Sequence, residues 1–207
     1  MMRLPIFRLH QPASLSEALA LMGTAEGPTR LVGGGTDLWP NMKRRHQSAE
    51  DVVSLRNVAE LRGIRGEAGG EIRIGAMTTL SAVAASPVIR STLPALARAV
   101  ESISTPAIRN MASLGGNLCL DTRCTYYNQN QEWRESIDFC MKEGGTVCWV
   151  APQSPRCWAI SSSDTAPMLC ALDASIRLLS PDGERELPLA ALYEDDGIDY
   201  MTKRSDE

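Results

Sequence analysis

Four cysteines in the second half of this chain stand at spacings that could support a metal centre. They are separated by 15, 7 and 8 intervening residues: Cys124, Cys140, Cys148 and Cys157. Four thiolates can hold a [4Fe-4S] cluster or a structural zinc ion. Zinc sites usually contain cysteine pairs with about two to four residues between them, and the only close pair here is Cys119 and Cys124. The spacing favours a cluster and leaves zinc or free thiols open.

The segment around these cysteines has an unusual composition. Residues 118–163 contain five of the six cysteines and six of the ten aromatic residues of the chain. Aromatic side chains such as Tyr126 and Trp149 could shield a cluster and help to set its potential. This concentration predicts a structural unit of its own, set into an α+β domain. The other two cysteines have simpler explanations, because Cys119 follows a glycine loop and Cys170 stands in an apolar helix.

Two glycine-rich segments could bind a phosphate. The first runs from a predicted strand through three glycines into a helix start: Leu31, Val32, Gly33, Gly34, Gly35, Thr36, Asp37 and Leu38. The second places a hydroxyl and an amide around paired glycines: Ser113, Leu114, Gly115, Gly116 and Asn117. Glycine lets the backbone approach a ligand closely, and successive N–H groups at a helix N-terminus bind anions. A single such turn is most often only a turn, but two could grip both ends of a pyrophosphate.

The remaining composition argues against several classes of function. The formal net charge of −4 argues against a general nucleic-acid binder, and no apolar run approaches the roughly 18 residues of a membrane span. Residues 1–12 lack the apolar core of a signal peptide, so we expect a cytoplasmic chain whose cysteines bind a metal or stay free. Only two histidines, His10 and His46, are present, and no acid–base pair stands out. The chemistry available here belongs to cofactors.

Capping residues and hydrophobic periodicity predict the elements that must position these groups. Ser14 and Glu17 form a capping box for a helix through Met22. The first glycine loop is expected to lead into a brief helical turn that stops near Pro40. The other predicted elements are strands at 29–32, 52–55, 71–75, 175–179 and 185–187, helices at 79–85, 94–102 and 165–172, a helical turn at 58–61 and a loop at 107–117.

The two glycine loops, the second together with residues 109–112 before it, resemble the FAD-binding signatures of the molybdenum hydroxylase flavoproteins. That group includes the medium subunit of carbon monoxide dehydrogenase and the flavin domain of xanthine oxidase. The resemblance implies the two-subdomain, α+β fold of the carbon monoxide dehydrogenase flavoprotein and vanillyl-alcohol-oxidase-like type. An N-terminal α/β subdomain would span residues 1–56 and a middle α+β subdomain residues 57–190, with FAD in the cleft between them. Residues 191–207 resemble a truncated linker into a C-terminal domain that this sequence lacks.

The same resemblance assigns roles to individual residues. Residues 31–38 and 113–117 would bind the FAD diphosphate and adjacent groups. Asp164 matches an aspartate that hydrogen-bonds FAD, and Ile103 matches a position that touches the flavin. In most of the family that aspartate follows the second loop within about ten residues, whereas residues 118–163 intervene here.

An insertion of this kind resembles that of the beta subunits of 4-hydroxybenzoyl-CoA reductases. There the inserted loop binds a [4Fe-4S] cluster through four cysteines, and the matching positions are Cys124, Cys140, Cys148 and Cys157. The resemblance implies an electron-transfer subunit with no catalytic residues of its own. It would work with a molybdopterin-binding large subunit, a small subunit with two [2Fe-2S] clusters, and ferredoxin as electron donor, to convert 4-hydroxybenzoyl-CoA to benzoyl-CoA.

Two other interpretations fit the residues. The chain could be the FAD subunit of an oxidative molybdenum hydroxylase that acts on another aromatic or acyl-CoA substrate. It could also be a zinc-stabilised, non-catalytic binding module whose glycine loops are only turns.

Overall fold

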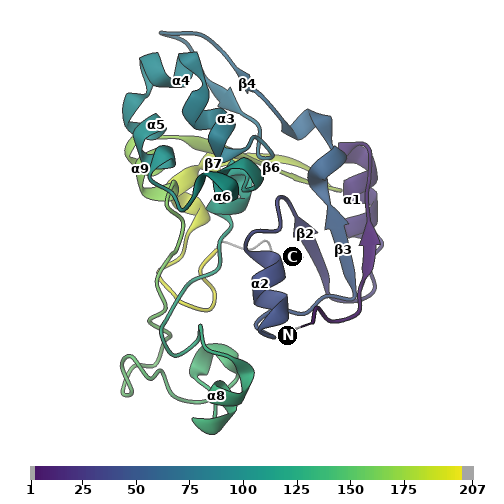
Figure 1. The fold of residues 1–207 in the computed structure, drawn as a ribbon, viewed down its shortest axis with the longest axis vertical. Coiled ribbons are helices and arrows are strands. Elements are labelled where there is room, and N and C mark those ends of the chain that lie inside the picture. Colours follow the sequence, from purple (N-terminus) through teal and green to yellow (C-terminus); the bar gives the residue numbers. More distant parts are fainter. Residues whose placement is uncertain (1–2, 202–207) are drawn as a thin grey trace.

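The computed structural model describes residues 3–201. Its N-terminal part is a three-stranded parallel sheet in the order β1–β3–β2, with β3 in the centre. Parallel neighbours require crossover connections, and here these carry helices. Figure 1 shows α1 and α2 packed beside this sheet. The elements are β1 (Arg8–His10), α1 (Leu15–Gly23), β2 (Thr29–Val32), α2 (Leu38–Lys43) and β3 (Asp51–Ser54).

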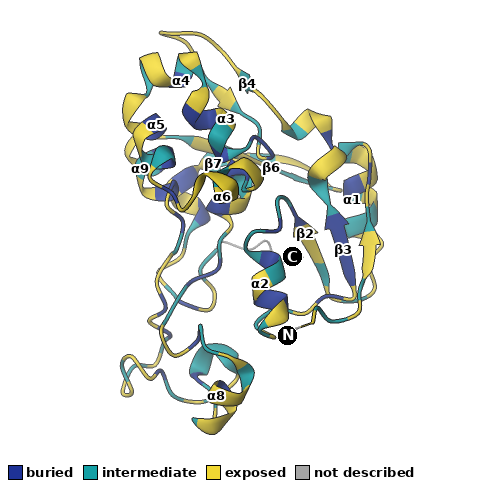
Figure 2. Ribbon diagram, viewed as in Figure 1, coloured by how far each residue is buried: buried dark blue, intermediate teal, exposed yellow. Residues whose placement is uncertain are grey.

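The central strand β3 is buried on both faces, as Figure 2 shows. Successive strand residues point to opposite faces, so Val52 and Val53 enter two different cores. Val52 packs in a cluster with Val32 and Met42, whereas Val53 packs with Ala18 of α1. The sheet is therefore a rigid support for the loop that leaves the end of β2.

The middle part of the chain is a helical layer with two small antiparallel sheets. Its core contains side chains with no exposed surface, including Leu80, Leu96 and Val100. One of these sheets contains strands β4 and β5, and the other contains strands β6 and β7. The elements are α3 (Leu80–Ala85), α4 (Pro87–Thr92), α5 (Pro94–Glu101), α9 (Ala166–Ala171), β4 (Ile64–Arg65), β5 (Arg73–Ile74), β6 (Ser175–Ser180) and β7 (Gly183–Pro188).

Several of the predicted elements are confirmed. Ser14 caps α1 by accepting a hydrogen bond from the Glu17 N–H at 3.2 Å. The strand at 29–32 is present with the predicted bounds, and β6 and β7 form the predicted hairpin. The mixed helix-and-strand class is also confirmed.

Two local predictions are wrong. The expected loop at 107–117 forms two short helices, α6 (Pro106–Met111) and α7 (Leu114–Leu118). Thr105 and Ser113 cap them through their side chains, and in the second helix this cap offsets the low helix propensity of Gly115 and Gly116. The helix expected to stop near Pro40 continues to Lys43, because Pro40 lies in the first turn, where its missing N–H has no helical partner to lose.

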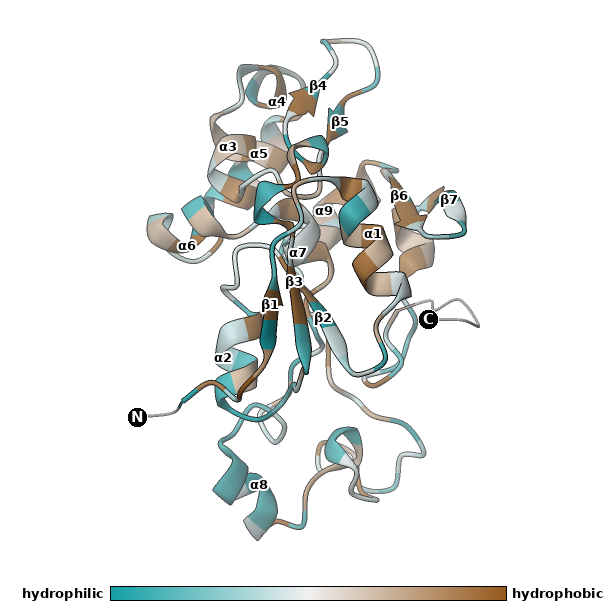
Figure 3. Ribbon diagram, turned by 90° about the vertical axis from the view of Figure 1, so that its right-hand side faces the viewer, coloured by the Kyte–Doolittle hydropathy of each residue, from teal (hydrophilic) through white to brown (hydrophobic). Residues whose placement is uncertain are grey.

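Residues 119–165 form a separate lobe beneath the helical layer (Figure 1). Its regular structure is limited to α8 (Gln131–Ser136), which Figure 3 shows to be hydrophilic, and a short 3-10 turn. Two backbone hydrogen bonds of 2.8 and 3.0 Å between Arg123 and Ile160 close the neck of this lobe.

The lobe is fixed to the segment that follows α2. The buried Arg134 donates a 2.8 Å hydrogen bond to the Arg44 carbonyl. The His46 ring lies 4.7 Å from the Tyr127 ring, and its Nε2 is 2.8 Å from the Tyr127 carbonyl oxygen. These contacts hold the cysteine-rich lobe next to the first glycine loop.

The end of the described chain returns to this region, where Tyr193 and Met201 form a bridge. Residues 202–207 of the predicted linker lie outside the described residues. Within residues 3–201, no helix combines the length and apolar character that crossing a membrane requires.

Candidate FAD cleft and cysteine cavity

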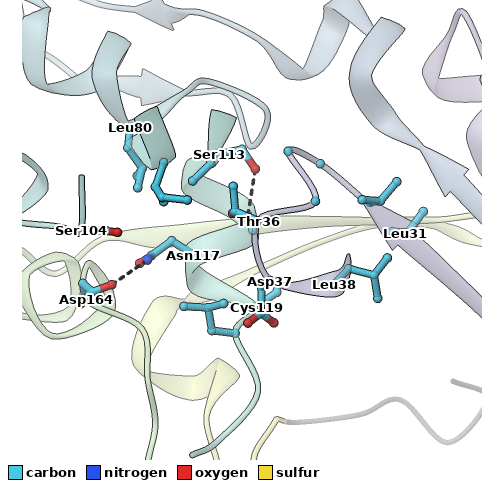
Figure 4. A pocket seen from close by; sticks show the side chains of 18 of the residues that line it. Leu31, Thr36, Asp37, Leu38, Leu80, Ser104, Ser113, Asn117, Cys119 and Asp164 are labelled. Atoms are coloured by element: carbon cyan, nitrogen blue, oxygen red, sulfur yellow. Dashed lines mark hydrogen bonds between the residues drawn. The ribbon is translucent and has the colours of Figure 1, made fainter. Parts of the chain in front are cut away.

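A cleft of about 440 Å³ lies between the N-terminal sheet and the helical layer. This size falls within the range of small-molecule and cofactor sites. Both glycine loops line it, and Figure 4 shows side chains from both parts of the chain around it. The predicted residues that line the cleft are Leu31, Val32, Gly33, Gly34, Gly35, Thr36, Asp37, Leu38, Ile103, Ser113, Gly116, Asn117 and Asp164.

Two predicted residues lie behind the cleft lining. Leu114 is buried in the helical core. The Gly115 N–H donates a 2.8 Å hydrogen bond to the Ala76 carbonyl, and a Cβ at this glycine would lie 2.8 Å from the Ala76 Cβ. Both residues position the second loop from below.

The two glycine loops touch each other through their backbones. A Cβ on Gly34 would lie 1.8 Å from the Met111 carbonyl oxygen, and one on Gly33 would lie 2.9 Å from the Ser113 Oγ. Gly35 has a φ of +73°, a conformation that disfavours other residues. The glycines are therefore required at this junction.

The first loop presents free backbone donors to the cleft. Among the described residues, the N–H groups of Gly34, Gly35 and Thr36 have no hydrogen-bond partner. Successive unpaired N–H groups form a concave site for an anion such as a phosphate. The residues present therefore fit the diphosphate of a dinucleotide.

The second loop is a helix cap linked to a hydrogen-bonded hub. Ser113 Oγ accepts from the Gly116 N–H at 3.2 Å. Asn117 donates from Nδ2 to Asp164 Oδ2 at 3.0 Å, and its Oδ1 accepts from Thr165 N and Oγ1 at 3.0 and 2.7 Å. Asn117 thus holds Asp164 at the cleft wall although 47 residues separate them.

Ile103 lies in a tight turn at the end of α5. The next residue, Ser104, has a φ of +47° and also lines the cleft. Arg109 Nη1 donates to the Ile103 and Ser104 carbonyls at 2.7 and 3.1 Å. Arg109, which belongs to the second FAD-binding signature, therefore stabilises the backbone of this turn.

Arg123, which belongs to none of the predicted sites, also lines the cleft. Its guanidinium pairs with Asp37, while the other oxygen of Asp37 accepts from Asn41 Nδ2 at 2.8 Å. Arg123 directly precedes Cys124, so this ion pair connects the first glycine loop to the cysteine-rich lobe. No local sequence signal indicates a pair between residues this far apart.

The four predicted metal ligands line one small, separate cavity. Cys124, Cys140, Cys148 and Cys157 share its wall with Tyr126 and Trp149. All four are free thiols, and Cys119 lines the flavin cleft instead.

The thiols do not converge on a single point. Among residues 3–201, no three His, Cys, Asp or Glu side chains are close enough to hold one metal ion. All four sulfurs of a cysteine zinc site lie about 2.3 Å from the one ion. The four thiolates of a [4Fe-4S] cluster each bind a different iron, so their sulfurs stand farther apart. The four thiols therefore line one cavity, and in the described part of the chain they do not form a converged single-ion site.

The thiol environment opposes ionisation in the absence of bound iron. Burial raises the pKa values of Cys140 and Cys157, and the neighbouring Cys124 and Cys148 add to this effect. Metal binding requires the thiolate form. Cations bound among these sulfurs would offset both the cost of burying the thiolate charges and the repulsion between neighbouring thiolates.

Comparison with known proteins identifies the class of this domain. Residues 5–204 match the family described as the FAD binding domain in molybdopterin dehydrogenase. The fold and cleft are those of an FAD-binding domain. The chain belongs to this molybdopterin dehydrogenase FAD-binding family.

Individual relatives agree with this assignment. The chain is 40% identical over 114 residues to the carbon monoxide dehydrogenase medium chain of Hydrogenophaga pseudoflava, covering 55% of this chain and 39% of that one. The solved structure of reconstituted CO dehydrogenase from Oligotropha carboxidovorans matches with a TM-score of 0.71 and 27% identity, covering 98% of this chain and 57% of that chain. The chain therefore spans only part of these relatives.

One relative aligns over a longer stretch. The aldehyde oxidoreductase FAD-binding subunit PaoB of Escherichia coli (strain K12) is 28% identical over 180 residues, covering 81% of this chain and 54% of that one. An alignment that covers this share of a 207-residue chain necessarily includes residues 118–163.

The contact between the glycine loops yields a direct prediction. Gly34→Ala lowers FAD affinity at least tenfold, about 1.4 kcal/mol, because the new Cβ forces the loops apart. Gly70→Ala is the matched control, since its nearest neighbour atom would be 3.7 Å away. Flavin fluorescence titration measures the affinity, with circular dichroism to check folding. Unchanged affinity in a folded Gly34→Ala variant would show that the junction does not shape the FAD site.

Proposed function

We propose that this chain is an electron-transfer flavoprotein subunit that holds FAD in the cleft and a [4Fe-4S] cluster in the cysteine cavity. The observation that supports the cluster is that four cysteines spread over residues 124–157 line one cavity. The lobe that carries them is bonded to the flavin loop through Arg123 and Asp37. The two cofactors would then be neighbours in one chain.

In this proposal the residues of the cleft have distinct tasks. Residues 31–38 and 113–117 hold the diphosphate and adjacent groups, Asp164 hydrogen-bonds FAD, and Ile103 contacts the flavin. Asn117 fixes the Asp164 carboxylate through its amide. Bound FAD supplies the exchange between two-electron and one-electron steps.

The proposed assembly contains a molybdopterin-binding large subunit and a small subunit with two [2Fe-2S] clusters. The domain boundaries we propose are 1–56, 57–190 with the insertion at 118–163, and a linker from 191. The proposed compartment is the cytoplasm, which keeps thiols reduced. Neither a nucleic acid nor a membrane is among the proposed partners.

The proposed reaction of the complex is reductive removal of the phenolic hydroxyl from 4-hydroxybenzoyl-CoA. Two electrons and two protons release this hydroxyl as water and leave benzoyl-CoA. This chain would pass the electrons, one at a time, from ferredoxin toward the molybdenum subunit. Its own residues make no bond to the substrate.

A second candidate is supported by the long alignment with PaoB. That relative is an aldehyde oxidoreductase FAD-binding subunit, and its alignment runs through residues 118–163. By analogy, the complex would oxidise an aldehyde, and this chain would receive electrons rather than deliver them.

Anaerobic addition of each substrate to the complex distinguishes these candidates. We expect 4-hydroxybenzoyl-CoA to reoxidise the prereduced flavin, measured as recovery of its absorbance, and an aldehyde to leave the oxidised flavin unchanged. Bleaching of the oxidised flavin by an aldehyde, without reoxidation by the thioester, would instead establish the second candidate.

The cluster proposal predicts the effect of removing one ligand. Wild-type protein purified anaerobically should contain roughly four irons with matching sulfide, and Cys140→Ser should lose most of both while it retains FAD. Cys170→Ser is the matched control, because Cys170 packs against the helical core and does not line the cavity. Iron, sulfide and flavin analyses measure the outcome.

Two results would contradict this prediction. One is stoichiometric zinc without iron or sulfide in the wild-type chain, which would favour the zinc-stabilised module. The other is an iron content that is unchanged in Cys140→Ser.

A further inference from the structure

A lysine is buried beside the cysteine cavity. Lys142 follows Cys140 by two residues, its side chain is only 7% exposed, and it lines the cavity with the four cysteines. Lysine is almost never buried without a partner. Its position therefore needs an explanation.

Lys142 belongs to a closed polar group, which we call the Lys142 network. Its Nζ donates to Asp121 Oδ1 and to the Gly197 carbonyl, both at 2.8 Å. It also lies 5.0 Å from the centre of the Tyr127 ring and 5.2 Å from that of Tyr200. The Tyr127 hydroxyl donates to the second oxygen of Asp121 at 3.3 Å.

This network stands between the cysteine cavity and the flavin cleft. Lys142 and Tyr127 line the cysteine cavity and also a neighbouring cavity of about 510 Å³. That neighbouring cavity shares Cys119 and Tyr200 with the flavin cleft. Lys142 is therefore close to any group that the cysteines hold. It lies on the side of the cysteine cavity that faces the flavin cleft.

The pair of Lys142 and Asp121 is oriented with respect to the cavity. Lys142 lines the cysteine cavity, whereas Asp121 lines the neighbouring cavity and not that of the cysteines. Of the two charged residues, Lys142 is thus the one that borders the cavity of the thiols. Charges in a buried site are screened less than at the surface, so the charge of the residue that borders the cavity, Lys142, acts there more strongly than that of Asp121.

We propose that Lys142 raises the reduction potential of a cluster held by Cys124, Cys140, Cys148 and Cys157. This inference rests on the proposed function. One-electron reduction adds a negative charge to the cluster, and a nearby ammonium stabilises that form. Lys142 acts through the electric field of its ammonium group and makes no bond to the cluster. It is therefore not a ligand of the cluster.

A purely structural role is the alternative explanation. By bonding the Gly197 carbonyl, Lys142 also ties the lobe to the end of the described chain. Loss of that tie would lower stability in every Lys142 variant. It would not shift the potential in opposite directions when the positive and the negative member of the pair are neutralised separately.

The test is a redox titration of the full chain, purified anaerobically and followed by the cluster signal. Lys142→Gln, which keeps a donor for Asp121, should lower the equilibrium constant for one-electron reduction at least tenfold, about 59 mV. Asp121→Asn should shift the potential upward. Lys142→Arg should stay near wild type, as should the control Lys43→Gln, which removes an exposed lysine.

The outcomes separate this inference from the proposed function. Iron and sulfide are counted in the same samples. A loaded wild type with an unchanged potential in both Lys142→Gln and Asp121→Asn overturns the inference and leaves the cluster in place. A wild type without iron overturns both. If Lys142→Gln does not fold, the upward shift in Asp121→Asn decides the result, because that variant retains the lysine.

Discussion

The structure depends on one backbone contact, the approach of Gly34 to the Met111 carbonyl. Any Cβ on Gly34 would overlap this oxygen, so only glycine lets the N-terminal sheet and the helical layer meet at this distance. The contact places the unpaired N–H groups of the first loop opposite the helix cap at Ser113. A dinucleotide cleft results from the way the two parts are joined, rather than from a pocket within either part.

The second organising feature is the attachment of the cysteine-rich lobe. Arg123 binds Asp37 of the first loop, and Arg134 binds the backbone after α2. Lys142 adds a contact to the carbonyl of Gly197. Because these contacts tie the lobe to the first loop, to the segment after α2 and to the end of the described chain, the lobe stays beside the cleft although it contains little regular structure. A one-electron centre in the lobe would therefore have a fixed relation to the flavin.

Local patterns in the sequence predicted much of the cleft. Glycine loops, capping residues and strand periodicity depend on neighbouring residues, so the two glycine segments at 31–38 and 113–117 could be found from the sequence alone, whereas the helix that Ser113 caps was not predicted. The helix over Pro106–Met111 was missed because it has only six residues and buries none of them, so no hydrophobic periodicity marks it. Arg123 and Lys142 were also missed, because their partners lie 86 and 21 residues away and no local pattern encodes such pairs.

The most direct test of the account is an anomalous diffraction experiment at the iron edge, on crystals of the chain grown anaerobically with FAD. We expect iron density in the cavity lined by Cys124, Cys140, Cys148 and Cys157, with each thiolate bound to a different iron, and FAD density between the two glycine loops. A single zinc ion in the cavity, or FAD bound away from those loops, would contradict it.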